Sequence, residues 1–156
     1  MELSDILTPD RCLCKIQGVS KKRLLKTLST ILGESFSNLD ENQVFESMMA
    51  REQLGSTGIG NGIAIPHCRV PECNEITGCL ITLETYVDYD STDGNPVDLI
   101  FVLIVPEEKE EDHVITLAVL AEKFHNQQFC DSLRTAQNND ELYKCAISHK
   151  YWNIVS

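Results

Sequence analysis

Apolar residues in the first fifty positions follow two different periods, and each period predicts a different element. Apolar and polar residues alternate over 12–16, which predicts a short, half-buried strand. Over 21–32 the apolar residues recur at helical spacing, so we predict a helix with an N-terminal cap at Ser20 and a C-terminal cap at Gly33. A second helix is predicted over 40–51 on the same grounds.

The middle of the chain is rich in β-branched and apolar residues. Residues 63–65 and 76–85 are predicted to be strands. The uninterrupted apolar run at 99–105 predicts a strand that is buried on both faces, and we expect it to be central in the sheet. Four of the eight glycines lie within 54–62, so the backbone there must turn tightly or allow a close approach.

The last third of the chain is predicted to be helical. One helix has an apolar stripe of the kind that packs on a core, made of Val114, Leu117, Ala118, Ala121 and Phe124. Two shorter helices are expected near 128–136 and 141–147, and the acidic run at 107–112 is interpreted as a solvated loop. The order of elements predicts an α/β fold: a single domain over 1–156 with a mixed central sheet of about four or five strands flanked by helices.

Composition and charge narrow the function classes. The chain has 24 acidic and 13 basic side chains and a formal net charge of −11, which repels nucleic acid and anionic membranes, so we expect neither as a partner. The longest apolar run is too short to span a bilayer and the N-terminus resembles no export signal, which predicts a cytoplasmic protein. Seven scattered cysteines predict reduced thiols and no metal site.

The glycine-rich loop and His67 are the candidate chemistry. The loop lacks the lysine of a Walker loop and the flanking elements of a dinucleotide loop, so only a general affinity of its N–H groups for anions remains. His67 follows Pro66 at a predicted strand end, where a neutral imidazole can act as a nucleophile toward a phosphoryl group. Arg51 would supply a cationic donor and the loop would supply N–H donors, although a single surface histidine is by itself more often inert.

A long segment ending at His67 resembles a known family. Residues 51–67 read REQLGSTGIGNGIAIPH, which is closely similar to the active-site segment of enzyme IIA domains of the bacterial phosphotransferase system. The likeness is to the fructose/mannitol class, and most of all to its nitrogen-regulatory members. It extends through 96–101, 105–106, His113, 133–134 and 140–143, and therefore covers nearly the whole chain.

This resemblance implies a phosphocarrier without a cofactor. His67 would accept a phosphoryl group from an HPr-like histidine phosphocarrier protein, and His113 and Arg51 would stabilise that group beside the ring. By its position alone, His113 would instead be a first-turn helix residue at the edge of the apolar stripe. Weaker candidates for donors to the phosphoryl group are Ser56, Thr57 and Gly58.

The function that the resemblance implies is regulation of target proteins, such as kinases, channels or transporters, according to the phosphorylation state. Two alternatives stay open: a sugar-transport component that passes phosphate to a IIB domain, and a non-catalytic binding module. Cys68 departs from the small residue that often follows the active histidine in the family, and we expect it to be an inert packing residue. His125 and His149 match no functional position and are expected to be surface or packing residues.

Overall fold

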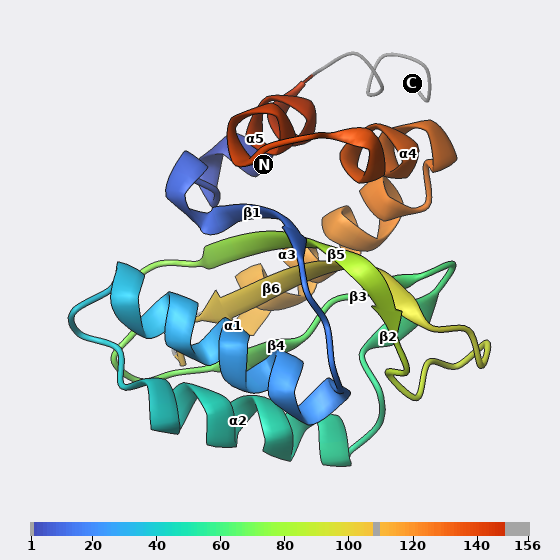
Figure 1. Ribbon diagram of the computed structural model, residues 1–156. Coiled ribbons are helices and arrows are strands. Elements are labelled where there is room, and N and C mark those ends of the chain that lie inside the picture. Colours follow the sequence, from blue (N-terminus) through green and yellow to red (C-terminus); the bar gives the residue numbers. More distant parts are fainter. Residues whose placement is uncertain (1, 108–109, 149–156) are drawn as a thin grey trace.

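The computed structural model describes residues 2–107 and 110–148, and for 110–112 it describes the backbone alone. A six-stranded sheet lies between two layers of helices (Figure 1). The strands are β1 (Cys12–Ile16), β2 (Gly58–Gly60), β3 (Ile63–Ala64), β4 (His67–Arg69), β5 (Thr77–Val87) and β6 (Val97–Val105). The α-helices are α1 (Lys21–Ser35), α2 (Glu41–Gln53), α3 (Glu110–Phe124), α4 (Gln127–Thr135) and α5 (Asn139–Ile147), and two 3-10 turns, Leu3–Asp5 and Pro9–Arg11, precede β1.

Strand β6 is the centre of the sheet, as its apolar run predicts. It pairs antiparallel with β5 and parallel with both β3 and β4, while β1 lies parallel on the far side of β5 and β2 forms a hairpin with β3. Alternate β6 side chains enter two separate hydrophobic clusters, one under α1 and α2 and the other under α3, α4 and α5. The predicted mixed sheet flanked by helices is confirmed, with six strands where four or five were expected.

The two extra strands are short, and both lie where the sequence shows no strand pattern. β2 lies inside the glycine-rich segment, and β4 begins directly after Pro66. Both β3 and β4 run parallel to β6, so 63–69 is in effect one strand along β6 that is interrupted at Pro66. The Pro66 carbonyl accepts a hydrogen bond from the N–H of Leu103 in β6 at 2.9 Å, which keeps the interrupted strand on the sheet.

Of the two caps predicted for the first helix, the one at Ser20 is confirmed. Ser20 accepts a backbone N–H bond at the start of α1, and Asp40 does the same at the start of α2. The predicted cap at Gly33 is wrong, because α1 continues to Ser35. A Cβ atom at position 33 would lie 3.1 Å from the Cβ of Glu41, so a glycine at this position within α1 allows the start of α2 to pack closely against it.

The predicted apolar stripe of α3 is also partly wrong. Leu117 and Phe124 pack in the core, but Val114 is 63% exposed, and Ala118 and Ala121 are exposed as well. The buried face instead centres on Leu120, because more positions of this helix are apolar than one face can bury. The acidic run is not all loop, since α3 begins at Glu110, while 108–109 lie outside the described residues.

Candidate functional site

His67 opens β4, and the interruption of the strand at Pro66 places a free carbonyl beside its ring. The Nδ1 atom of His67 lies 2.8 Å from the carbonyl oxygen of Ile65. Because a carbonyl oxygen can only accept a hydrogen bond, the ring proton is on Nδ1 and the lone pair is on Nε2. The fold thereby selects the tautomer in which Nε2 is the nucleophilic nitrogen.

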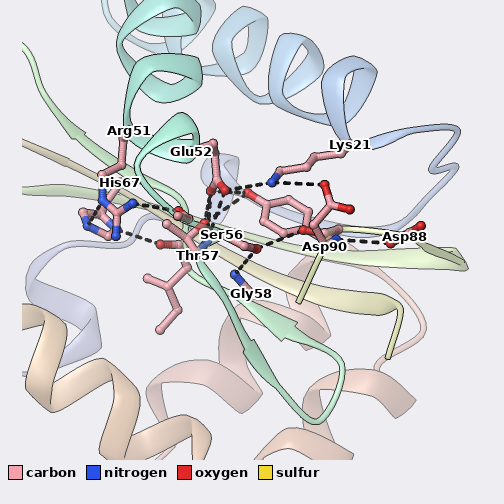
Figure 2. Close-up of polar contacts among 12 residues, drawn as sticks. Lys21, Arg51, Glu52, Ser56, Thr57, Gly58, His67, Asp88 and Asp90 are labelled. Carbon is pink, nitrogen blue, oxygen red and sulfur yellow. Dashed lines mark hydrogen bonds and ion pairs between the residues drawn. The ribbon is translucent and has the colours of Figure 1, made fainter. Parts of the chain in front are cut away.

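Arg51 reaches the same ring from the last turn of α2. Its Nε–H donates to Nε2 of His67 at 3.2 Å, and its Nη1–H donates to the carbonyl oxygen of Gly55 at 2.8 Å (Figure 2). Burial lowers the pKa of His67, and the positive charge of Arg51 lowers it further. The imidazole is therefore neutral near pH 7, with its lone pair held beside a guanidinium group.

His113 completes the group from the first turn of α3. Its ring centroid lies 5.2 Å from that of His67, with the ring planes at 71°, and the residue is only 9% exposed. Together these residues border an open pocket of about 420 Å³, which is also bordered by Leu54 and Arg69. A neutral nucleophile among cationic groups suits an anionic electrophile such as a phosphoryl group.

The sequence did not single out Arg69, although a local signal exists. His67 and Arg69 are two residues apart in β4, and side chains at that spacing point to the same face of a strand. The exposed apolar side chains nearby were also missed: Leu54, at the end of α2, is 84% exposed and borders the pocket. Val114, next to His113 in the chain, is exposed as well.

The three loop candidates for phosphate donors lie in a different network. The hydroxyl of Ser56 donates to the carbonyl oxygen of Tyr89 and accepts from the N–H of Gly58. The N–H and hydroxyl of Thr57 both donate to the carboxylate of Glu52. The hydroxyls of Ser56 and Thr57 and the N–H groups of Thr57 and Gly58 are thus engaged within the chain, and none of the three residues borders the His67 pocket, so their role as phosphate donors stays a prediction.

Glu52 is the centre of that network, and sequence reasoning missed it. Its buried carboxylate accepts hydrogen bonds from Thr57 and from the hydroxyl of Tyr89 at 2.9 Å, and pairs with Lys21 at 3.0 Å. The Lys21 ammonium also lies 4.6 Å from the centre of the Tyr89 ring. Burial and the nearby carboxylate raise the pKa of Tyr89, which keeps its hydroxyl protonated as a donor. The partners come from α1, the loop after α2 and the loop after β5, so no single local motif contains them.

The remaining candidates lie outside this chemistry. Burial raises the pKa of Cys68 to about 12, so its thiol stays protonated and packs in the core beneath the pocket. His125 is exposed just after α3, and His149 lies outside the described residues. Within 2–107 and 110–148, no three histidine, cysteine or acidic side chains gather as a metal site, and no helix is long and apolar enough to cross a membrane.

Comparison with known proteins identifies the family. Residues 5–149 match the family model described as phosphoenolpyruvate-dependent sugar phosphotransferase system, EIIA 2. The chain belongs to this enzyme IIA family. This enzyme IIA chain is 42% identical over 147 residues to a nitrogen regulatory protein of Pseudomonas aeruginosa, which spans 94% of this chain and 96% of that protein. It is 39% identical over 145 residues to a nitrogen regulatory protein of Escherichia coli, spanning 92% and 88% of the two chains.

Solved structures agree with the fold of the enzyme IIA chain. The nitrogen regulatory protein IIA-Ntr from Neisseria meningitidis superposes with a TM-score of 0.85 at 38% identity, covering 92% of this chain and 98% of that one. The mannitol IIA protein from Escherichia coli has a TM-score of 0.75 at 15% identity, covering 90% and 98%, and so shares the fold. The enzyme IIA chain is thus a member of the phosphotransferase system whose relatives include nitrogen regulatory proteins.

Proposed function

We propose that this chain is a phosphohistidine carrier of the nitrogen-related phosphotransferase system, and that Nε2 of His67 accepts the phosphoryl group. One observation carries the proposal: Ile65 holds the ring proton on Nδ1, so the free lone pair on Nε2 meets Arg51 at the pocket. Membership of the enzyme IIA family and the names of the relatives support the same activity. The donor would be a phosphorylated HPr-like carrier protein, with no cofactor needed at this chain.

The transfer would proceed by in-line displacement at phosphorus. The Nε2 lone pair of His67 forms the new N–P bond while the N–P bond to the donor histidine breaks, and that electron pair returns to the donor nitrogen. The His67 ring gains positive charge in this step, so its Nδ1–H bond to the Ile65 carbonyl becomes charge-assisted and strengthens. The Nε–H of Arg51, which donates to the Nε2 lone pair in the resting site, would then donate to a phosphoryl oxygen instead, and His113 would lie beside the phosphoryl group.

Phosphorylation would also serve as the regulatory signal. A phosphoryl group on His67 adds a charge of about −1.5 to −2 to a pocket that now presents Arg51 and Arg69. Target proteins such as kinases, channels or transporters would then bind the two forms differently. Transfer onward to a IIB domain is the second candidate, favoured by the family's place in a sugar phosphotransferase system.

A labelling experiment tests the proposal. The chain is incubated with an HPr-like carrier that has been phosphorylated from labelled phosphoenolpyruvate, beside the variants His67→Ala and His125→Ala. His125→Ala is the matched control, because that ring is exposed and distant in sequence from the pocket residues. We expect label on the wild type and on His125→Ala but none on His67→Ala. Absence of label on the wild type would overturn the carrier function and favour a binding module, and chase of the label into a IIB domain would establish the transport role.

A further inference from the structure

The carboxylate of Glu52 is buried and fully engaged, although it points away from His67. The residue is 8% exposed, and its two oxygens receive the N–H of Thr57 at 3.1 Å, the Thr57 hydroxyl, the Tyr89 hydroxyl and the Lys21 ammonium. Figure 2 shows Arg51 pointing toward His67 and Glu52 pointing toward Lys21 from adjacent positions of α2. A buried carboxylate is strongly unfavourable unless it is paired and hydrogen-bonded, so its partners are held firmly.

From Thr57, hydrogen bonds lead to the proton-bearing nitrogen of His67. The carbonyl oxygen of Thr57 accepts the N–H of Ile65 at 2.9 Å. The carbonyl oxygen of the same Ile65 accepts the Nδ1–H of His67 at 2.8 Å. The position of the carbonyl that fixes the tautomer therefore depends on where Glu52 holds Thr57.

A second route leads from the same turn to the nucleophilic nitrogen. Gly55 lies between Glu52 and Thr57, and its N–H donates to the backbone carbonyl of Glu52 at 3.1 Å. The carbonyl oxygen of Gly55 accepts from Nη1 of Arg51, whose Nε–H meets Nε2 of His67. The turn that Glu52 fastens at Thr57 thus also orients Arg51.

We propose that Glu52 is a positioning residue for phosphoryl transfer: by anchoring Thr57 it fixes both hydrogen bonds of the His67 ring, at Nδ1 through Ile65 and at Nε2 through Arg51. This inference deepens the proposed function and rests on it for its meaning. Its geometric content, the tautomer and the arginine contact, exists in the unphosphorylated protein. It can therefore be tested separately from transfer.

The variant Glu52→Gln tests positioning through the ring tautomer, which the charge of Glu52 does not set by itself. The charged and titratable groups around His67 are Arg51 and Glu52 from α2, Arg69 from β4 and His113 from α3. The pKa of His67 does not separate positioning from electrostatics, because the Ile65 hydrogen bond and the Glu52 charge both raise it while Arg51 lowers it.

We expect Glu52→Gln to populate both ring tautomers of His67 in long-range ¹⁵N–¹H spectra of the folded protein. A glutamine keeps one acceptor oxygen for Thr57 and Tyr89, but its N–H₂ group would face the Lys21 ammonium and the Thr57 N–H, so it cannot hold all the partners of the carboxylate. We expect phosphoryl acceptance to fall about 10- to 100-fold, as for misplaced reacting groups. A single Nδ1–H tautomer or a rate equal to that of the wild type would each overturn the proposal.

Two further sets of variants keep the test decisive. Asp90→Asn removes a carboxylate 3.8 Å from Lys21 that is 77% exposed, and it should leave the tautomer and the rate unchanged. Thr57→Val keeps every charge and nearly the same volume, so it reports on positioning even if Glu52→Gln does not fold; Thr57→Ser should restore the wild-type spectrum. Identical spectra for Thr57→Val and Thr57→Ser would overturn the proposal. A wild type that shows the single tautomer but takes no label would overturn the proposed function alone.

Discussion

Replacement of Arg51 by methionine tests the centre of the candidate site. Methionine keeps an unbranched apolar stem of comparable reach but removes the guanidinium, and with it the bonds to Nε2 of His67 and to the Gly55 carbonyl. Because the positive charge of Arg51 lowers the pKa of His67, this variant should raise that pKa. The change therefore has one effect on the resting ring and a second effect on transfer.

The size of the effect on transfer follows from which bonds Arg51 makes at each stage. In the resting site, Nη1 is occupied by the Gly55 carbonyl and Nε by the neutral lone pair of His67, a bond of about 1 kcal/mol. In the transition state, Nε and Nη2 can donate two charge-assisted bonds of about 1.5–3 kcal/mol each to phosphoryl oxygens. The net loss in Arg51→Met is then about 2–5 kcal/mol, which corresponds to about 30-fold to several-thousand-fold in rate.

Single-turnover transfer from the phosphorylated carrier, followed by rapid quench, measures this rate, and an NMR titration of His67 measures the pKa. Arg69→Met is the matched control, since it removes an exposed positive charge from the same pocket, and we expect it to change the rate less than tenfold. A rate for Arg51→Met within threefold of the wild type, or an unchanged pKa of His67, would refute the role that the geometry gives to Arg51.

Three further predictions follow from the described contacts. Because burial lowers the pKa of His67, phosphoryl acceptance should stay constant down to about pH 6.5 and decline only below it. The free energy of unfolding should also fall as the pH drops from about 6.5 through the folded pKa, since the unfolded chain takes up the proton first. Urea unfolding of the wild type and of His67→Gln between about pH 5 and 7 checks this second effect. Gly62→Ala should cost about 2–4 kcal/mol in denaturant unfolding, because φ is +80° there and a Cβ would lie 2.8 Å from Nη2 of Arg134 and 2.9 Å from Oδ1 of Asp98. Cys68 should be alkylated by iodoacetamide only on unfolding, since its pKa is about 12 in the fold, and modification of the native protein at the rate of the unfolded chain would contradict its burial.

The sequence predicts the long elements because their patterns are long enough to decide the period. The apolar run of β6 is confirmed as the central strand, with alternate side chains in two cores. The end of α1 could not be predicted, because glycine is typical of a C-terminal cap, whereas Gly33 lies inside the helix and packs closely against Glu41 of the next helix. That contact depends on tertiary packing, which local propensity does not contain.

Part of the candidate site could also be predicted from local sequence, and part depends on tertiary packing. His67, Arg51 and His113 are indicated by the motif and the family resemblance, and the structure brings all three together at one pocket. Lys21 and Tyr89 could not be predicted, because they meet Glu52 only after α1 and the loop following β5 have packed against the end of α2. Polar networks that join distant segments leave no periodic trace in the chain.

The attachment of His67 to the middle of the sheet has a consequence for how its state can be sensed. β4 is hydrogen-bonded to β6, whose residues are almost entirely buried, so the backbone of His67 is attached directly to the central strand. We therefore expect a group added to the ring to leave the backbone of β4 in place. Any protein that distinguishes the two forms should therefore detect the altered charge by direct contact with the pocket, and its contact surface should include the exposed pocket residue Leu54.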